Sequence, residues 1–438
     1  MYREAQHYLQ KWKACDNRKP LVIRGARQVG KTWLMKWFGQ SAYENYAYVN
    51  FDGNDRMAHL FSGDLDVKRI IAGLAIETGV TIEPGKTLLI FDELQEVPRA
   101  LTSLKYFCEN APEYHVMAAG SLLGVALHAG TSFPVGKVAF LDMYPMSFLE
   151  FLEAVGENGL AELCTQRNWD LIAPFRGKYE EILKQYYFVG GMPEAVSTFH
   201  ERRDYIATRE IQTRILASLE QDFSKHAPNA IVPRIRMLWN SIPSQLSKEK
   251  RKFIYGLVRK GARAREYEMA MSWLIDCGLI HKVTRITRPG MPLRAYEDLK
   301  SFKLFALDVG LLAAMTSLDA RTLLSGNDVF TEFKGSLTEQ YVLQQLKSTC
   351  QMPVHYWSHD KGMAEIDFVI QYASMIIPIE VKAQTNLQAK SLKSYRSRYS
   401  PPLAIRTSLA GYHVNEGLAD IPLYALYQLD ETIDEIMG

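Results

Sequence analysis

One short stretch of the sequence combines residue types that handle phosphate groups. Residues 21–32 read LVIRGARQVGKT, which matches the G-x-x-x-x-G-K-[ST] pattern directly after an apolar run. The glycines let main-chain N–H groups turn inward, where they can meet a polyanion. Lys31 would reach the β- and γ-phosphates of a nucleotide, and Thr32 would place its hydroxyl on Mg²⁺. The binding residues predicted from this pattern are Gly25, Ala26, Arg27, Gln28, Val29, Gly30, Lys31 and Thr32.

A second apolar run ends in acidic residues. Residues 87–93 read TLLIFDE, so Asp92 and Glu93 stand where a buried strand would end. We expect Asp92 to hold Mg²⁺ through its water shell and Glu93 to orient and deprotonate the attacking water. Two acids after a strand can also begin a helix, and it is the phosphate loop that favours the catalytic interpretation.

A third group of charged residues lies near the end of the chain, inside two strand-like stretches, EIDFVI and IIPIEVKA. Because an unpaired charge inside a sheet is costly, such residues are normally paired or bind metal. Asp367 and Glu380 could hold Mg²⁺, and Glu339, from a helix-like stretch upstream, could add a carboxylate. Lys382, on the same strand face as Glu380, would position the water and offset the charge of the transition state. The alternative is a structural ion pair between Lys382 and an acid.

The elements that must position these residues follow from the pattern of apolar residues. Strand-like and helix-like stretches alternate up to about residue 150, and this alternation predicts a doubly wound parallel sheet. Helix-periodic stretches follow. They stop at KHAPNAIVP, where two prolines indicate a boundary near residue 229.

The next segment is strongly basic although the whole chain is nearly neutral. Residues 231–294 hold 14 Lys or Arg against 4 Asp or Glu, a local net charge of +10, so the rest of the +2 chain carries −8. Its pattern of short helices and then a strand resembles a winged helix, with TRITRPGMPLRAYE as the wing. This excess of positive charge fits a polyanion partner, most simply DNA, although a solvated face or a subunit contact would have the same composition. Its centre is a basic turn made of Arg259, Lys260, Arg263 and Arg265.

Composition sets wider bounds on the protein class. The chain has 438 residues, of which 47% are hydrophobic and 23% are charged, values that are ordinary for globular proteins of two to four domains. Its five cysteines form no C-x-x-C pair and are odd in number, which suggests reduced thiols in a cytoplasmic protein. No apolar run reaches the length of about 18 residues that a membrane span needs, so we expect no membrane partner.

Several stretches resemble one known family. VIRGARQVGKTWL, LLIFDELQEVP, AAGSLLG and YPMSFLEFL are similar to the AAA-type ATPases of bacteria and archaea, in the subgroup with a C-terminal domain of unknown function. The resemblance continues through YYFVGGMPEAV and KLFALDVGLL to PIEVKA, nearly the whole chain. It implies ATP and Mg²⁺ as cofactors, with Pro193 against the adenine. It also implies that Ser121 senses the γ-phosphate, although an ordinary turn role for Ser121 stays open.

The chain departs from this family at one position. The subgroup commonly shows Gly-Arg before YPMSF, whereas this sequence has Gly136 and Lys137. Lysine lacks the planar fork that spans phosphate oxygens, so an arginine finger at this position is in doubt. Arg99 is a weak substitute within the core. Related ATPases complete the site from a neighbouring subunit, which implies a homo-oligomer.

The last stretch resembles a second superfamily. Glu339, Asp367, Glu380 and Lys382 follow the order of the PD-(D/E)xK restriction-endonuclease-like proteins, which implies a metal-dependent nuclease site.

The predicted fold class is α/β, a P-loop AAA-type parallel sheet core with three further parts. The expected domains are the core at 1–155, a helical lid at 156–228, a winged helix at 229–320 and a restriction-endonuclease-like α/β domain at 321–438. The expected function is ATP hydrolysis coupled to DNA binding, with possible Mg²⁺-dependent cleavage. The alternative is an ATP-controlled signalling or scaffold switch whose last domain binds a partner without cutting.

Overall fold

The chain folds into two compact units. The computed structural model describes all residues except 121–133, 249–251, 326–330, 351, 360–363 and 386–387. The N-terminal unit comprises Tyr2–Tyr144 with Asp276–Leu279, and the C-terminal unit comprises Pro145–Ile275 and Ile280–Gly438 together with Met1. None of the described helices is both long and apolar enough to cross a membrane.

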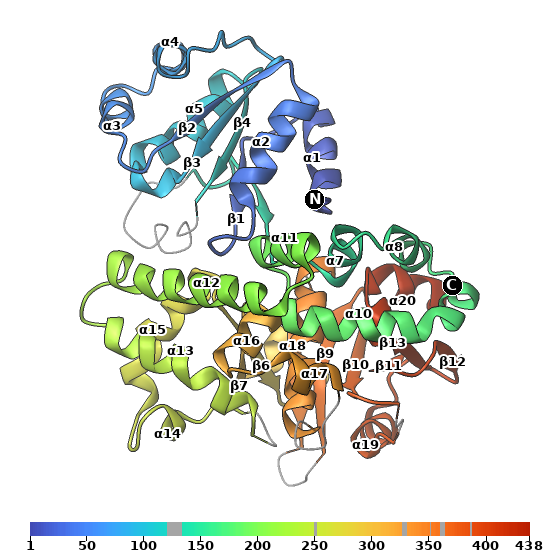
Figure 1. Ribbon diagram of the computed structural model, residues 1–438. Helices are drawn as coiled ribbons and strands as arrows, with labels where there is room; N and C mark the ends of the chain where they lie inside the picture. Colours follow the sequence, from blue (N-terminus) through green and yellow to red (C-terminus); the bar gives the residue numbers. More distant parts are fainter. Residues whose placement is uncertain (121–133, 249–251, 326–330, 351, 360–363, 386–387) are drawn as a thin grey trace. The chain divides into compact units, whose positions relative to one another are not determined.

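The N-terminal unit is built on a five-stranded sheet with the order β2-β3-β4-β1-β5, in which each neighbouring pair is parallel. Its strands are β1 Leu21–Arg24, β2 Asn45–Asn50, β3 Thr87–Asp92, β4 His115–Ala119 and β5 Ala139–Asp142. Its helices are α1 Ala5–Ala14, α2 Lys31–Ala42, α3 Asp55–Ser62, α4 Val67–Thr78, the 3₁₀ turn η1 Leu94–Glu96 and α5 Pro98–Asn110. Helices α1 and α2 lie on one face of the sheet, and α3, α4 and α5 cover the other (Figure 1).

Local sequence explains why these elements begin where they do. All six residues of β3 are buried, as an apolar run covered by helices on both faces requires. The side chains of Asn54 and Asp66 accept hydrogen bonds from the first turns of α3 and α4, and Pro98 occupies the start of α5. The carboxyl ends of β1 and β3 share one edge of the sheet, so the phosphate loop and the acidic pair meet there. The predicted α/β class with a parallel core is confirmed.

The C-terminal unit combines a helical layer with an eight-stranded sheet of order β12-β13-β11-β10-β9-β8-β6-β7. Its helices before the sheet are α7 Phe148–Ala154, α8 Asn158–Thr165, α9 Trp169–Ile172, η2 Ala173–Phe175, α10 Arg176–Val189, α11 Pro193–Arg202, α12 Tyr205–His226, α13 Val232–Leu246, α14 Tyr255–Val258 and α15 Ala264–Asp276. The remaining helices are η3 Leu293–Tyr296, α16 Val309–Met315, α17 Ala320–Ser325, α18 Thr331–Gln345, the π turn η5 Leu346–Cys350, α19 Lys390–Tyr399, η6 Leu423–Ala425 and α20 Leu429–Met437. The strands are β6 Ile280–Ile286, β7 Glu297–Ala306, β8 Val354–Ser358, β9 Glu365–Tyr372, β10 Met375–Val381, β11 Ala404–Ser408, β12 His413–Asn415 and β13 Leu418–Pro422.

The hairpin of β6 and β7 belongs to this large sheet. β6 pairs with β7 antiparallel and with β8 parallel, so one sheet draws strands from both sides of the predicted boundary at residue 320. The order α13, α14, α15, β6, β7 is the one expected for a winged helix, and residues 156–228 contain helices only, as expected for a lid. The four-domain division itself stays a prediction.

Candidate active site

The phosphate loop joins β1 to α2 through a backbone that only certain residues can adopt. Gly25 has φ +138°, and a Cβ at this position would lie 2.1 Å from the main-chain oxygen of Met143. Gly30, which precedes the first residue of α2, has φ +98°, and Gln28 has φ +65°. The two glycines of the motif are therefore required by the backbone geometry of the loop.

The side chain of Lys31 lies inside this loop. Its Nζ donates hydrogen bonds to the carbonyl oxygens of Gly25 and Ala26, at 2.9 and 2.7 Å. Burial removes the ammonium from water and lowers the pKa of Lys31 to about 8, although the charges of Glu93 and Asp92 oppose this effect. The loop carbonyls thus hold the lysine at the position where phosphate oxygens are expected.

Arg3, which no motif includes, fixes the loop from outside. This buried side chain donates from Nη1 to the carbonyl of Val29 at 2.7 Å and from Nη2 to the carbonyl of Tyr144 at 2.7 Å. The arginine thus ties the phosphate loop to the segment that follows β5. Sequence reasoning missed it because no pattern near the N-terminus relates Arg3 to residues so far along the chain.

Asp92 is the point where the two predicted motifs meet. Its Oδ2 accepts a hydrogen bond from the hydroxyl of Thr32 at 2.6 Å. The same oxygen accepts a bond from the hydroxyl of Tyr48, on β2, at 3.1 Å. Burial and the charge of Asp92 raise the pKa of Tyr48, so the phenol stays protonated and able to donate. Tyr48 is the second residue that sequence reasoning missed.

Glu93 follows directly in a strained backbone. Its φ is +52°, uncommon for a residue with a side chain, and such strain is typical of functional sites. Its Oε2 accepts a hydrogen bond from the side chain of Gln95 at 2.6 Å, which limits where the carboxylate can point. The half-buried Glu93 therefore lies beside Asp92 at the edge of the sheet where the phosphate loop opens.

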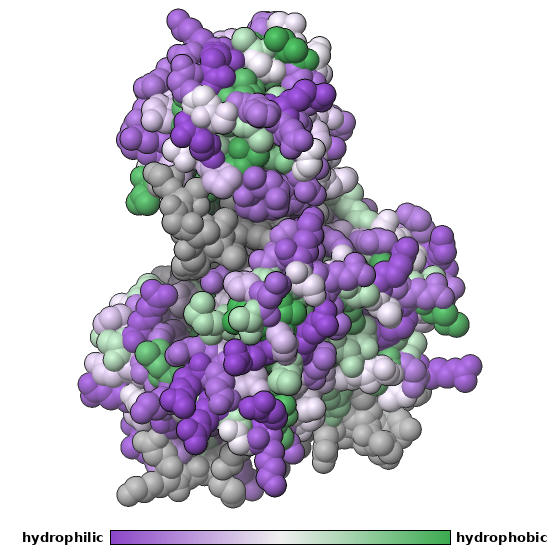
Figure 2. Space-filling model, turned by 90° about the vertical axis from the view of Figure 1, so that its left-hand side faces the viewer, coloured by the Kyte–Doolittle hydropathy of each residue, from purple (hydrophilic) through white to green (hydrophobic). Residues whose placement is uncertain are grey.

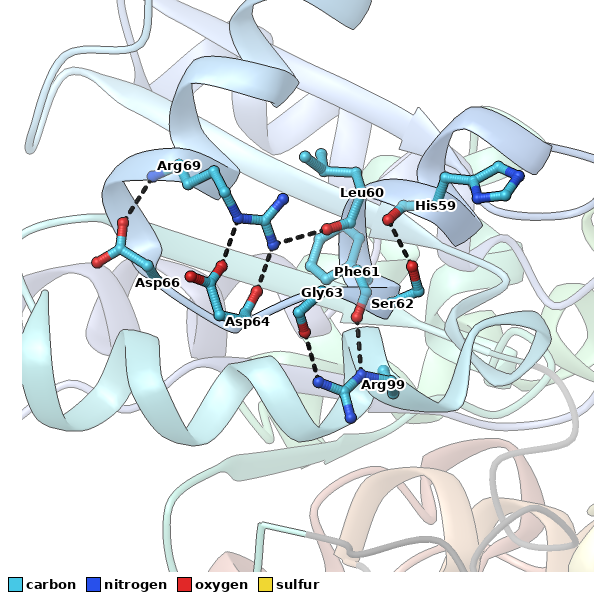
Figure 3. Close-up of polar contacts among 9 residues, drawn as sticks. All are labelled: His59, Leu60, Phe61, Ser62, Gly63, Asp64, Asp66, Arg69 and Arg99. Atoms are coloured by element: carbon cyan, nitrogen blue, oxygen red, sulfur yellow. Dashed lines mark hydrogen bonds and ion pairs between the residues drawn. The ribbon is translucent and has the colours of Figure 1, made fainter.

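Arg99 and Lys137, the two basic residues discussed for the role of an arginine finger, have partners inside the N-terminal unit. Arg99 donates from Nε to the carbonyl of Phe61 at 2.9 Å and from Nη2 to the carbonyl of Gly63 at 2.6 Å, at the end of α3 (Figure 3). Lys137 forms an ion pair with Glu109 at 2.8 Å. The Arg99 side chain is thus used to close the turn between α3 and α4.

Two further predicted site residues are not tested by this geometry. Ser121 lies outside the described residues. Pro193 begins α11 in the C-terminal unit, where the main chain of Gly191 donates to the buried Oδ2 of Asp308 at 2.7 Å and accepts from Met146 at 2.7 Å. The roles of Ser121 and Pro193 remain predictions.

The predicted C-terminal site residues do lie close together. β9 and β10 are antiparallel neighbours, and Oδ2 of Asp367 accepts a hydrogen bond from the main-chain N–H of Val381 at 2.8 Å. Nζ of Lys382 lies 2.8 Å from Oε1 of Glu380. Burial, and then the like charge of Asp367, raise the pKa of Glu380 to about 7.

Two charged residues that sequence reasoning missed join this group. Nζ of Lys303, on β7, lies 2.6 Å from Oε1 of Glu365 and 3.7 Å from Oε2 of Glu339. The signal was present in the sequence, because SFKLFAL places one lysine inside an apolar strand. Among the described residues no group of three or more His, Cys, Asp or Glu side chains has a metal-binding arrangement. We define the carboxylate cluster as Glu339, Glu365, Asp367 and Glu380.

The basic turn connects α14 to α15 and begins α15. All four of its side chains are exposed, and Arg259 has one ion pair, with Glu266 at 3.7 Å. Figure 2 shows the side of the C-terminal unit that carries α13, α14 and α15, where hydrophilic residues lie among apolar ones.

Comparisons with known proteins bear mainly on the N-terminal unit. Residues 17–152 match the family model described as an AAA domain. Residues 180–322 and 334–427 match two models described as domains of unknown function, DUF8612 and DUF4143. No curated protein sequence matches. These descriptions leave the winged-helix and nuclease-like assignments as predictions.

Two solved structures illustrate more distant likenesses. A Walker-type ATPase of Pyrococcus abyssi has 15% sequence identity, covers 72% of this chain and 95% of its own, and has a TM-score of 0.45. The ORC1 protein of Aeropyrum pernix in complex with DNA has 14% identity, covers 72% of this chain and 91% of its own, and has a TM-score of 0.27. The AAA-domain match, together with the phosphate loop and its acidic partner, makes the N-terminal unit an AAA-type P-loop domain.

Proposed function

We propose that the N-terminal unit binds ATP with Mg²⁺ and hydrolyses it. The observation that carries the proposal is the 2.6 Å hydrogen bond between Thr32 and Asp92, which brings the two predicted metal-holding groups together beside the buried ammonium of Lys31. A hydroxyl and a carboxylate are oxygen donors of the kind that Mg²⁺ prefers, so the donor set fits the ion. When bound, Mg²⁺ neutralises charge on the phosphate oxygens.

The residues of this chain then have separate tasks. Lys31 exchanges its loop carbonyl partners for phosphate oxygens. Thr32 and Asp92 would hold the ion, and Tyr48 holds the Asp92 carboxylate in place. Glu93 orients the attacking water and takes its proton. Gln95 fixes the Glu93 carboxylate for this role.

Calorimetry and hydrolysis assays on three variants test the site. Lys31→Ala should lose most ATP affinity, because the buried cation opposite the phosphates is gone. Glu93→Gln should keep ATP affinity and lose roughly 10²- to 10⁴-fold in hydrolysis rate, the usual contribution of a general base. The exposed Glu96→Gln serves as the matched control and should behave as wild type. Wild-type ATP affinity in the Lys31 variant would reject the site.

DNA is the polyanion that we propose as partner of the C-terminal unit. The exposed basic turn and the local net charge of +10 support this assignment, because phosphate contacts by Lys and Arg supply most non-specific DNA affinity. Nucleotide state in the N-terminal unit would then control how the chain engages DNA.

Metal-dependent DNA cleavage is the second candidate function. Asp367, Glu380 and Lys382 lie together as that chemistry requires, and Oε2 of Glu380 is buried with no hydrogen-bond partner among the described residues. Against it, both ion pairs of Lys303 bring a further ammonium into the same cluster. We therefore favour a last domain that binds without cutting, which is the switch-like alternative for this part of the chain.

A further inference from the structure

Lys303 is a lysine with no solvent exposure at all. It lies on β7, where its neighbours Phe302 and Leu304 are also buried. Lysine is almost never fully buried unless it is paired, because removing an ammonium from water is costly. The position of Lys303 therefore depends on the groups that surround its Nζ atom.

Those groups are carboxylates and one aromatic ring. Oε1 of Glu365 lies 2.6 Å from Nζ, and Oε2 of Glu339 lies 3.7 Å from it. Nζ also stands 4.9 Å from the centroid of the Tyr356 ring, a distance at which the ring face attracts a cation. The charge of Lys303 extends to Glu380, where it opposes the rise in pKa caused by burial.

We propose that Lys303 takes the place of a divalent cation in the carboxylate cluster. Each predicted metal ligand already has a charged or hydrogen-bonding neighbour. Glu339 lies beside the ammonium of Lys303, and Glu380 is paired with Lys382. Asp367 accepts a main-chain hydrogen bond from Val381. A divalent ion added here would share its carboxylates with two ammonium groups and be repelled by both.

This arrangement has a consequence for the last domain. Its cluster has the order of residues of a metal-dependent nuclease, but its positive charge comes from the protein. The cluster is then a permanent feature of the folded unit that needs no metal, and the domain does not cut DNA through Mg²⁺.

Titration of the protein with Mn²⁺ tests the proposal. Every protein carries Asp92→Asn and is free of nucleotide, so that the phosphate loop contributes no metal site and the outcome does not depend on the proposed ATPase activity. With Lys303 present, calorimetry and the Mn²⁺ spin-resonance signal should show no Mn²⁺ binding that depends on Asp367. Proteins with and without Asp367→Asn should therefore give the same result. Lys303→Met should create one Mn²⁺ site per chain, because one of the two competing ammonium groups is gone.

Matched variants separate this effect from a general change in the protein. Lys300→Met removes an exposed lysine of the same strand and should create no site. Adding Asp367→Asn to Lys303→Met should abolish the new site. If Lys303→Met does not fold alone, rescue by Mn²⁺ but not by equal ionic strength of NaCl supports the proposal, and failure of Mn²⁺ to rescue rejects it.

Two results overturn the proposal directly. One is Mn²⁺ binding that depends on Asp367 while Lys303 is intact. The other is a folded Lys303→Met protein that shows no such binding.

Discussion

The ammonium of Lys31 is buried before any ligand arrives. Its hydrogen-bond acceptors are two neutral carbonyls of its own loop, and burial lowers its pKa to about 8. In the proposed ATP complex, negatively charged phosphate oxygens would replace these carbonyls, favour the charged form of Lys31 and raise its pKa. We therefore expect nucleotide binding to be coupled to the protonation of this one side chain.

The coupling predicts how ATP affinity depends on pH. We expect the pKa of Lys31 to be higher in the ATP complex than the value of about 8 in the free protein. Binding should then take up a proton above pH 8, and ATP affinity should fall as pH rises. The limiting slope is roughly tenfold per pH unit, from one proton per site. Calorimetry from about pH 7.5 to 9.5 measures the slope. The phosphates of ATP do not titrate in this range, because their last pKa is about 6.

Lys31→Met provides the control for this pH dependence. The variant binds more weakly, but its remaining affinity should not change over the same range. Wild-type affinity that stays constant across the whole range would show that Lys31 keeps its proton without phosphate, contrary to the proposed coupling.

Among the elements, local pattern predicted the strands and the loop of the proposed ATP site. The glycines, the buried strand β3 and its acidic end depend on neighbours in sequence. Thr32 and Asp92, one from each motif, form a hydrogen bond. Arg3 and Tyr48 were not predicted. Each acts through one or two long-range hydrogen bonds, which no periodicity records.

The C-terminal sheet shows more clearly that sequence pattern does not predict long-range contacts. The stretch TRITRPGMPLRAYE, which connects β6 to β7, was predicted to be a wing, but the pairing of β6 with β8 in a larger sheet was not predicted. That pairing places β7 in the same sheet as β9 and lets Lys303 reach Glu365. Sequence pattern predicts that charged residues in apolar strands are paired or bind metal. Here one partner, Lys303, comes from β7, which the same pattern assigns to the winged-helix domain.

The basic turn carries a prediction that belongs to the element joining α14 and α15. Replacing Arg259, Lys260, Arg263 and Arg265 by glutamine should weaken duplex DNA binding at every sequence, because these side chains would neutralise phosphates. The slope of log K against log salt should become shallower by about 0.9 for each phosphate that is no longer neutralised. Fluorescence anisotropy over a series of salt concentrations measures this slope.

A matched charge change elsewhere controls for net charge. The four exposed lysines Lys11, Lys19, Lys68 and Lys105 lie in the N-terminal unit, and their replacement by glutamine should leave the slope unchanged. If wild type and the basic-turn variant have the same slope, the basic turn does not contact DNA phosphates and instead faces another partner or solvent.

For the whole molecule, the question is which arginine would complete the proposed ATP site. The N-terminal unit contains seven arginines, and one of them, Arg27, is part of the phosphate loop. The other six donate hydrogen bonds to carbonyl or carboxylate oxygens of the same unit: Arg3, Arg18, Arg24, Arg56, Arg69 and Arg99. A finger from among these six would have to break one of these hydrogen bonds.

We therefore expect a second copy of the chain to supply the arginine. An arginine finger is typically worth about 10³- to 10⁵-fold in rate, so ATP hydrolysis per chain should rise steeply with protein concentration, in step with self-association measured by ultracentrifugation. Adding Lys31→Ala chains, which bind little ATP but keep their arginines, to dilute wild type should raise the rate per wild-type chain. Hydrolysis per chain that stays constant from the dilute monomer upward, and that added Lys31→Ala chains do not change, would mean that a single chain forms the complete site.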